Sequence, residues 1–145
     1  MAESTPETTK ATARPARPIN ILIVDDSSTM RMVLRRIVDL TDVPIGTVYE
    51  AVNGREALKI LETCDVDALF TDINMPVMSG YELLLAIARE PRWNQMLRIV
   101  VSTDGSELRQ EEVREAHVSL YITKPFRPEA VRNVLSRITH VGRWT

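Results

Sequence analysis

The chain has 145 residues, of which 44% are hydrophobic, so it is long enough for one sizeable core but short for two independent domains. Its 18 basic and 20 acidic residues are mixed along the sequence and give a formal net charge of -2, which argues against a nucleic-acid or anionic-membrane partner. The single cysteine, Cys64, excludes an internal disulfide and agrees with a reducing compartment. No segment has the apolar length of a secretory signal or a membrane span, so we expect a cytoplasmic protein without membrane insertion.

The beginning of the chain differs in composition from the rest. Residues 1–17 are rich in Ala, Thr, Pro and charge and show no apolar periodicity. We interpret them as a disordered tail, with a tether or partner-binding role as the alternative. A single domain is then expected over residues 18–142.

After this tail, two types of apolar periodicity alternate along the chain. Residues 19–24 are almost continuously apolar, as in a central strand of a parallel sheet. Across residues 30–38 the apolar positions fall three and four apart, which predicts an amphipathic helix. A short strand is expected at residues 47–51, followed by a helix that Asn53 caps and in which Glu56 bonds back to the cap.

The alternation continues with a third and a fourth unit. Residues 68–70 form the third expected strand, and Ser79 and Glu82 have the spacing of a capping box at the start of the next helix. The fourth strand, at residues 99–101, precedes a helix over residues 106–116 that has few apolar positions and should be lightly held. Its apolar anchors are Leu108, Val113 and Ala116.

A fifth unit completes the pattern. Residues 120–122 form its strand, and Pro128, a residue type favoured at the first helical position, begins its helix. Five strand-helix units in strict alternation predict an α/β fold with a parallel sheet and helices on both faces, because each right-handed crossover returns over one face of the sheet.

Polar side chains follow four of the expected strands. The carboxyl ends of parallel strands share one edge, where ligands bind, and the residues there are Asp25, Asp26, Asp72, Ser102 and Lys124. Three converging carboxylates repel one another, so either one is protonated or a cation lies among them. A cation is the simpler solution, and oxygen ligands without His or Cys suit a hard ion such as Mg²⁺.

A metal ion together with Lys124 would make this edge attractive to phosphate. The carboxylate of Asp72 can then act as a nucleophile and form an aspartyl phosphate, with Ser102 donating a hydrogen bond. Each piece alone has a structural alternative: a turn or helix N-terminus for the Asp pair, a helix cap for Ser102 and a loop for Lys124. Their convergence at one edge favours the functional interpretation.

Four parts of the sequence carry a resemblance to a known family. The motifs Asp-Asp-Ser-Ser-Thr-Met-Arg (25–31), Asp-Ile-Asn-Met-Pro-Val-Met-Ser-Gly (72–80), Ser102 and Tyr-Ile-Thr-Lys-Pro-Phe (121–126) resemble the receiver domain of two-component response regulators, in particular its stand-alone chemotaxis type. The resemblance covers most of the expected domain. It implies a flavodoxin-like, doubly wound five-stranded parallel sheet in the order 2-1-3-4-5, flanked by five helices.

The resemblance also implies roles for individual residues. Asp72 would be the phosphoacceptor, and Lys124, joined to Pro125 by a cis bond, would contact the phosphoryl group. Ser102 would move toward the phosphoryl oxygens, and Tyr121 would turn into the vacated space, which changes the surface of the fourth helix, fifth strand and fifth helix. The implied Mg²⁺ ligands are Asp25, Asp26, Asp72 and the backbone carbonyl of Asn74.

Three positions qualify this resemblance. Asn74 and Asp104 lie two residues beyond the phosphoacceptor and the switch hydroxyl, where this family tunes the lifetime of the phosphoryl group. Polar groups there predict self-dephosphorylation within seconds to minutes. His117 stands where receivers often have glycine after the fourth helix, so we expect a tighter or strained turn.

The leading functional interpretation is a single-domain response regulator that receives a phosphoryl group from a histidine kinase and then binds a partner such as a motor component, a kinase or a relay protein. It would catalyse only its own phosphorylation and dephosphorylation, as a monomer or a weak phosphorylation-dependent dimer. One alternative is a phosphate sink for a shared kinase. Another is a small Asp-based phosphatase, which is disfavoured because Asn74 stands where a second acid is expected and no cap insertion is visible. A purely structural interaction domain would lack Mg²⁺ binding.

Overall fold

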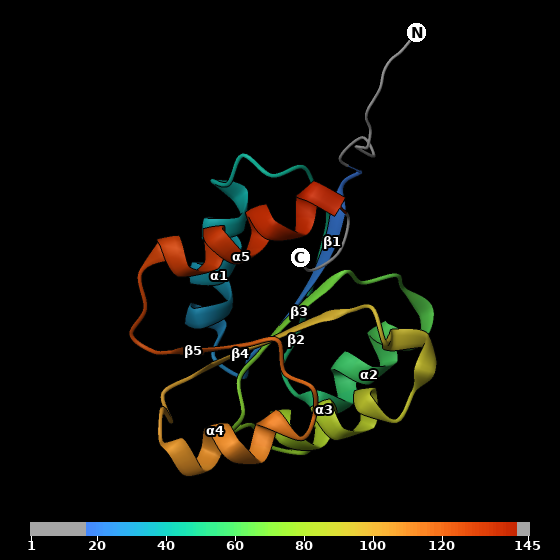
Figure 1. Cartoon of the computed structure of the whole chain (residues 1–145), viewed down its shortest axis with the longest axis vertical. Helices are drawn as coiled ribbons and strands as arrows, with labels where there is room; N and C mark the ends of the chain where they lie inside the picture. The colour runs from blue at the N-terminus through green and yellow to red at the C-terminus, as the bar shows by residue number, and fades with distance from the viewer. Residues whose placement is uncertain (1–16, 142–145) are drawn as a thin grey trace, which may run out of the picture.

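A computed structural model describes residues 17–141 of the chain, with the backbone alone at residues 107–108 and 139–141. Five parallel strands form one sheet in the order β2-β1-β3-β4-β5 (Figure 1). This confirms the predicted α/β class and strand order. The strands are β1 (Ile19–Val24), β2 (Ile45–Ala51), β3 (Ala68–Thr71), β4 (Leu97–Ser102) and β5 (Leu120–Thr123).

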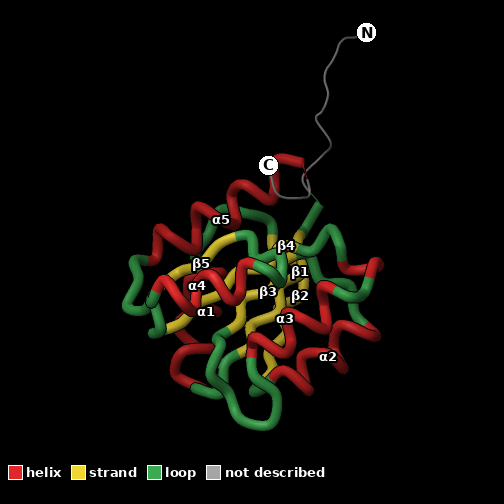
Figure 2. Tube along the Cα trace, turned by 60° about the horizontal axis from the view of Figure 1, so that its bottom comes forward, coloured by secondary structure: helices red, strands yellow, loops and turns green. Residues whose placement is uncertain are grey.

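Five helices cover the two faces of this sheet. Helices α1 and α5 pack on one face, and α2, α3 and α4 pack on the other, so the sheet lies as a middle layer between them (Figures 1 and 2). A short 3-10 helix, η1 (Pro91–Trp93), precedes β4. The helices are α1 (Ser28–Asp39), α2 (Gly54–Thr63), α3 (Gly80–Ala88), α4 (Glu107–Arg114) and α5 (Pro128–Val141).

Strand β1 lies between β2 and β3, as its continuous apolar run predicted. Ile21 and Ile23 point into the core formed with α1 and α5. Leu22 and Val24 point into the core formed with α2, α3 and α4. A strand that contributes to both cores has no solvent-facing side, which explains why no polar alternation interrupts it.

Four strands extend beyond their expected limits, β3 and β5 by one residue each and β2 and β4 by more. Strand β2 starts at Ile45, before the expected 47–51, because Gly46 gives no apolar signal although it lies within the paired segment. Strand β4 is longer at both ends than the expected 99–101. Arg98 interrupts its apolar pattern, yet this residue is buried in the strand with 5% of its surface exposed.

The predicted helix caps are present, with one difference in detail. The side chain of Asn53 accepts a hydrogen bond from the backbone N–H of Glu56 at 2.9 Å. The Glu56 carboxylate does not bond back to the cap as predicted; it accepts from the N–H of Val52, one residue earlier, at 3.3 Å. At α3 the capping box is complete, since Ser79 and Glu82 each accept from the backbone N–H of the other.

Helix α4 is shorter than the expected 106–116 and is held to the core near its end. Val113 and Ala116 are buried there, whereas the side chain of Leu108 lies outside the described part of the structure. His117 follows with a φ of 59°, a left-handed conformation that confirms the strain expected at this turn.

Of the expected tail, only Arg17 lies within the described residues. Residue 142, at the other end of the expected domain, lies outside them. Arg17 pairs with the carboxylate of Asp67 at 2.6 Å, which ties the start of the described chain to the connection before β3. Within the described residues, no helix has the length and apolarity needed to cross a membrane.

Candidate functional site

The structure brings together the three acids that the sequence placed at the carboxyl edge of the sheet. Asp25 and Asp26 follow β1, and Asp72 follows the adjacent strand β3. One carboxylate oxygen of each lies within 4.8 Å of the others. Asp25 is buried, Asp72 is half-buried and Asp26 is exposed, so the cluster opens to solvent on one side.

Lys124 reaches this cluster from the end of β5. Its Nζ donates to Oδ2 of Asp25 at 2.9 Å and to Oδ2 of Asp72 at 3.2 Å. Burial by itself lowers the pKa of Lys124, but the hydrogen bonds and charges of Asp25 and Asp72 outweigh burial and raise this pKa above its ordinary value. The predicted cis bond to Pro125 is confirmed. One ammonium thus offsets one of three formal negative charges, and a cation could compensate the negative charge that remains.

The backbone around Asp72 fixes the direction of its carboxylate. Oδ1 accepts from the N–H of Ile73 at 2.6 Å, while Oδ2 faces Lys124. Gly80, the last residue of the second motif, allows the start of α3 to approach this loop closely. A Cβ built there would lie 1.8 Å from the Asp72 carbonyl oxygen, so a larger residue would displace the loop that carries the predicted phosphoacceptor.

A pair of arginines holds the first acidic loop, and the sequence reasoning did not identify their contacts. Nη1 of Arg31 donates to the carbonyl oxygen of Asp25 at 2.7 Å, and its Nε donates to Glu50 at 3.0 Å. Arg35 donates to the other oxygen of Glu50 at 3.0 Å. The available signal was the position of Arg31 on the first turn of a helix that begins at the acidic pair. Glu50 was not predictable because it comes from β2.

The residues predicted to form a switch lie on β4, β5 and the loop after β4. Ser102 is fully buried, and its Oγ accepts from the N–H of Asp104 at 3.2 Å. The Tyr121 hydroxyl donates to the carbonyl oxygen of Asp104, and burial raises the pKa of Tyr121. In this structure the tyrosine is therefore already half-buried against the loop after β4 rather than turned away from it.

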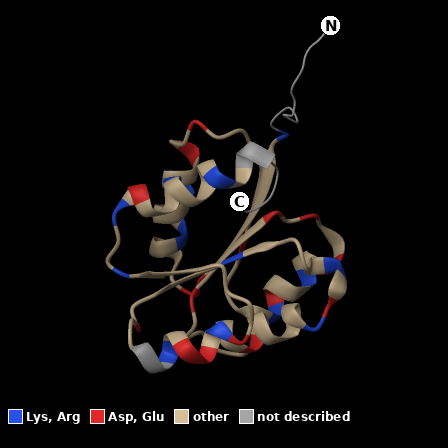
Figure 3. Cartoon of the chain, in the orientation of Figure 1, with Lys and Arg blue, Asp and Glu red and all other residues tan. Residues whose placement is uncertain are grey.

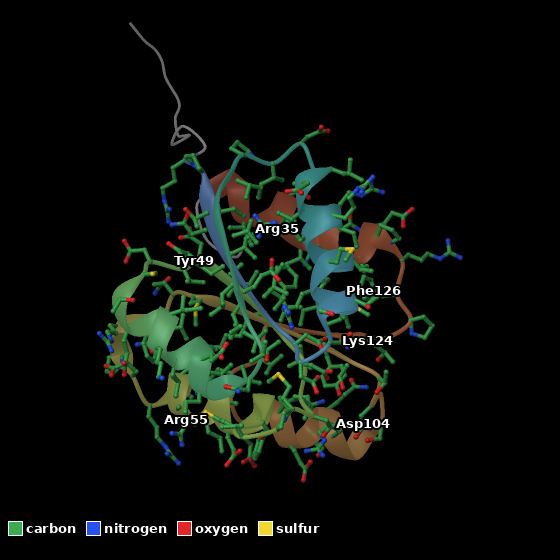
Figure 4. The ribbon with its side chains drawn as sticks, turned by 180° about the vertical axis from the view of Figure 1, so that it is seen from behind. Arg35, Tyr49, Arg55, Asp104, Lys124 and Phe126 are labelled. Carbon is green, nitrogen blue, oxygen red and sulfur yellow. The ribbon has the colours of Figure 1, made fainter. Side chains whose placement is uncertain are left out.

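The two residues expected to tune phosphoryl lifetime are placed differently from each other. Asp104 accepts from the N–H of Ser106 at 3.2 Å and from Nε of Arg109 at 3.4 Å. The hydrogen bonds from Ser106, followed by those from Arg109, lower the pKa of Asp104. Its carboxylate therefore accepts hydrogen bonds from residues at the start of α4. Asn74, by contrast, is exposed on the loop that carries Asp72. Figure 4 shows Asp104 and Lys124 on loops at the same end of the molecule.

The donor set fits a hard divalent cation. All three side chains offer carboxylate oxygens, and the cluster contains neither histidine nor cysteine. The exposed side at Asp26 leaves positions for water ligands, which Mg²⁺ retains in most protein sites. Asn74, the fourth residue of the predicted ligand set, lies on the same loop as Asp72.

A doubly wound parallel sheet with an acid cluster and a lysine at its carboxyl edge is typical of a receiver domain. The chain belongs to the response regulator receiver domain family, whose family model matches residues 21–136. This confirms the resemblance found in the sequence motifs. Within that family the chain is a receiver domain of the CheY type.

Several chemotaxis proteins are similar to this chain over most of their length. A CheY homolog of Campylobacter jejuni is 37% identical over 125 residues, which cover 86% of this chain and 95% of the homolog. CheY of Pseudomonas aeruginosa is 33% identical over 83% of this chain and 95% of its own length. The solved structure of the chemotaxis response regulator CheY4 of Vibrio cholerae superposes with a TM-score of 0.75 at 28% identity and covers 84% of this chain and 99% of CheY4.

Proposed function

We propose that this protein is a chemotaxis-type response regulator of the cytoplasm in which Asp72 accepts a phosphoryl group from a histidine kinase. The observation that carries the proposal is the position of the Asp72 carboxylate. It lies beside two further acids at the sheet edge and is hydrogen-bonded to Lys124. The similarity to CheY proteins supports the choice of signalling system.

In the proposed reaction, a carboxylate oxygen of Asp72 attacks the phosphorus atom of the kinase phosphohistidine. An O–P bond forms, the P–N bond breaks, and the electron pair of that bond stays on the imidazole nitrogen. Mg²⁺ held by Asp25, Asp26 and Asp72 would supply charge neutralisation for the phosphoryl oxygens. The ammonium of Lys124, already at the carboxylate, donates to the incoming phosphoryl group.

The output of this reaction is a change in the surface formed by α4, β5 and α5. The buried hydroxyl of Ser102 lies at the end of β4, and the phosphoryl group would draw it outward. Its present hydrogen bond from the Asp104 N–H would then be released. The loop after β4, whose Asp104 carbonyl accepts a hydrogen bond from the Tyr121 hydroxyl, would shift. The phosphoryl group stabilises one of two arrangements of these side chains. The partner is a protein such as a motor component, a kinase or a relay protein.

The charge distribution supports a protein partner. In the view of Figure 3, basic and acidic residues are interspersed along the helices and loops of the described part of the chain. Such a surface gives little non-specific attraction to nucleic acid.

The test of the phosphoacceptor is intact mass after incubation with acetyl phosphate and Mg²⁺. One phosphoryl group adds about 80 Da to the wild-type protein and nothing to Asp72→Ala. Asp67→Ala, which removes an acid near the opposite ends of the strands, should be phosphorylated like the wild type. Absence of the adduct in the wild type with both acetyl phosphate and a histidine kinase would refute the proposal.

A second experiment separates a signalling role from a phosphate sink. Beryllofluoride, a phosphoryl mimic, is added with Mg²⁺, and binding of candidate partner proteins is measured with and without it. Tighter binding in its presence supports signalling through α4, β5 and α5. Equal binding in both states indicates a sink.

A further inference from the structure

Arg98 is a buried cation whose role is independent of the phosphorylation site. It lies on β4 with 5% of its surface exposed. Its guanidinium is bonded to main-chain carbonyls: Nη2 donates to Trp93 at 2.8 Å, and Nη1 donates to His117 at a longer 3.4 Å. Nε has no hydrogen-bond partner. Among the described residues, no acidic side chain forms an ion pair with Arg98, so its charge is compensated only by carbonyl dipoles.

Arg98 is one of the residues that line a cavity of about 280 Å³. This cavity is located between the connection from α3 to β4 and the turn from α4 to β5, at the amino ends of β4 and β5, and therefore at the edge of the sheet opposite Asp72. None of its lining residues is an acid. The polar side chains that line it are Asn94, Gln95, Arg98, His117 and Ser119.

All of these polar side chains can donate hydrogen bonds. The Oγ of Ser119 accepts a hydrogen bond from the backbone N–H of Arg98 at 3.2 Å, so the hydroxyl hydrogen of Ser119 remains available to a ligand. The amides of Asn94 and Gln95 are exposed at the rim. A cavity lined by hydrogen-bond donors and by a guanidinium without an acidic partner is complementary to an oxyanion, whose oxygens only accept hydrogen bonds.

We infer that this cavity, the Arg98 cavity, binds a small oxyanion of the carboxylate or tetrahedral sulfate and phosphate type. The anion contacts the Nη groups of Arg98, because Nε is covered by protein. The anion supplies a full negative charge to compensate the guanidinium, which the two neutral carbonyl groups cannot do. The long Nη1 bond to His117 is the contact most easily exchanged for the anion.

The competing explanation is that Arg98 serves only to cap the carbonyls at the ends of η1 and α4. Trp93 is the last residue of η1 and His117 follows α4, so this explanation accounts for both hydrogen bonds. It does not account for a buried charge without an acidic partner, nor for an adjacent cavity lined by donors and free of acids. The two explanations differ in whether an anion binds, and this can be measured.

The experiment is a titration of the full-length protein with sodium sulfate and, separately, sodium acetate, without Mg²⁺ and at constant ionic strength. Binding is followed by ¹H–¹⁵N NMR at the Arg98 Nε–H, the Ser119 amide and the Gln95 side-chain amide. We expect saturable shifts at these groups, and the stronger of the two anions identifies the tetrahedral or the planar class. The same titration of Asp72→Asn should give an unchanged dissociation constant, which separates this cavity from the phosphorylation site.

Matched variants make the result decisive. Gln95→Glu places an acid at the rim and should weaken anion binding about tenfold, as expected for a like charge several ångströms from the ligand. Gln110→Glu makes the same change on α4 outside the cavity and should have little effect. Arg98→Met should abolish saturation; if that variant does not fold, the two glutamine variants carry the test. Shifts that never saturate, or that are equal in Gln95→Glu and Gln110→Glu, would show that Arg98 is only a cap and would overturn the inference.

Discussion

Val77, on the loop between Asp72 and α3, has a φ of 69° and 71% of its surface exposed. Besides His117, it is the only non-glycine residue with positive φ in the described part of the chain. The left-handed conformation costs a residue with a Cβ roughly 1–2 kcal/mol, and a β-branched side chain is a clear outlier there. The loop that carries the predicted phosphoacceptor is therefore strained.

Replacing this valine should relieve the strain. Full burial of valine contributes about 1.5–3 kcal/mol, so a side chain that is 71% exposed loses at most about 0.5–0.9 kcal/mol when it is removed. Asparagine visits the left-handed region readily, and Val77→Asn should raise the free energy of unfolding by about 0.5 kcal/mol. Val77→Gly should leave it near the wild-type value, because glycine adds roughly 0.5–1 kcal/mol of unfolded-state entropy.

Urea unfolding followed by circular dichroism measures these differences through the midpoint at constant m value. Val52→Asn is the control, since Val52 is 36% exposed and does not have a positive φ. It should lower the free energy of unfolding by about 1–2 kcal/mol through lost burial. If Val77→Asn destabilises the protein as much as Val52→Asn does, the strain argument is wrong.

Two further predictions concern the charges around the acid cluster. Lys124→Met leaves the buried Asp25 without its cation and should destabilise the protein by several kcal/mol near neutral pH, with partial recovery on adding Mg²⁺, as measured by urea unfolding. Because the pKa of Lys124 is raised in the folded state above 10.5, the stability from this pairing is present below that pH and is lost as pH rises through the folded-state pKa. The wild type should therefore lose more stability in alkali than Lys124→Met, and equal losses would contradict the pairing. Arg31→Met removes the hydrogen bond to the Asp25 carbonyl and should weaken Mg²⁺ binding about three- to tenfold in a calorimetric titration, whereas Arg35→Met, which shares only Glu50, should not. Similar effects of the two arginine variants would mean that the carbonyl contact does not position the loop.

Some of the site could be predicted because it depends on local sequence alone. A parallel sheet places the residues after each strand at one edge, so Asp25, Asp72 and Lys124 could be assigned to one site without coordinates. The capping box at α3 was equally accessible, because both partners lie within one helical turn. The convergence of the acids within 4.8 Å follows from the strand order β2-β1-β3-β4-β5, which the family resemblance supplied.

Other features depended on contacts that no local pattern encodes. The ion pair between Lys124 and Asp25 joins the ends of β5 and β1, strands that are not neighbours in the sheet. Asp104 was predicted to tune the lifetime of the phosphoryl group, and the hydrogen bonds of its carboxylate to Ser106 and Arg109 at the start of α4 were not part of that prediction. These hydrogen bonds depend on the path of a loop, and hydrophobic periodicity does not specify it.

The sequence by itself determined the alternation of strands and helices, the two-sided burial of β1 and the set of residues at the carboxyl edge. This was possible because buried positions recur along the sequence with the spacing of a helix or a strand. Tertiary structure alone decided that Arg98 is buried inside β4 and that Val77 takes a left-handed conformation. A polar residue within an apolar run and a β-branched residue in a turn both contradict local preference. Such residues are tolerated only where the surrounding packing compensates for them, and that packing comes from segments distant in sequence.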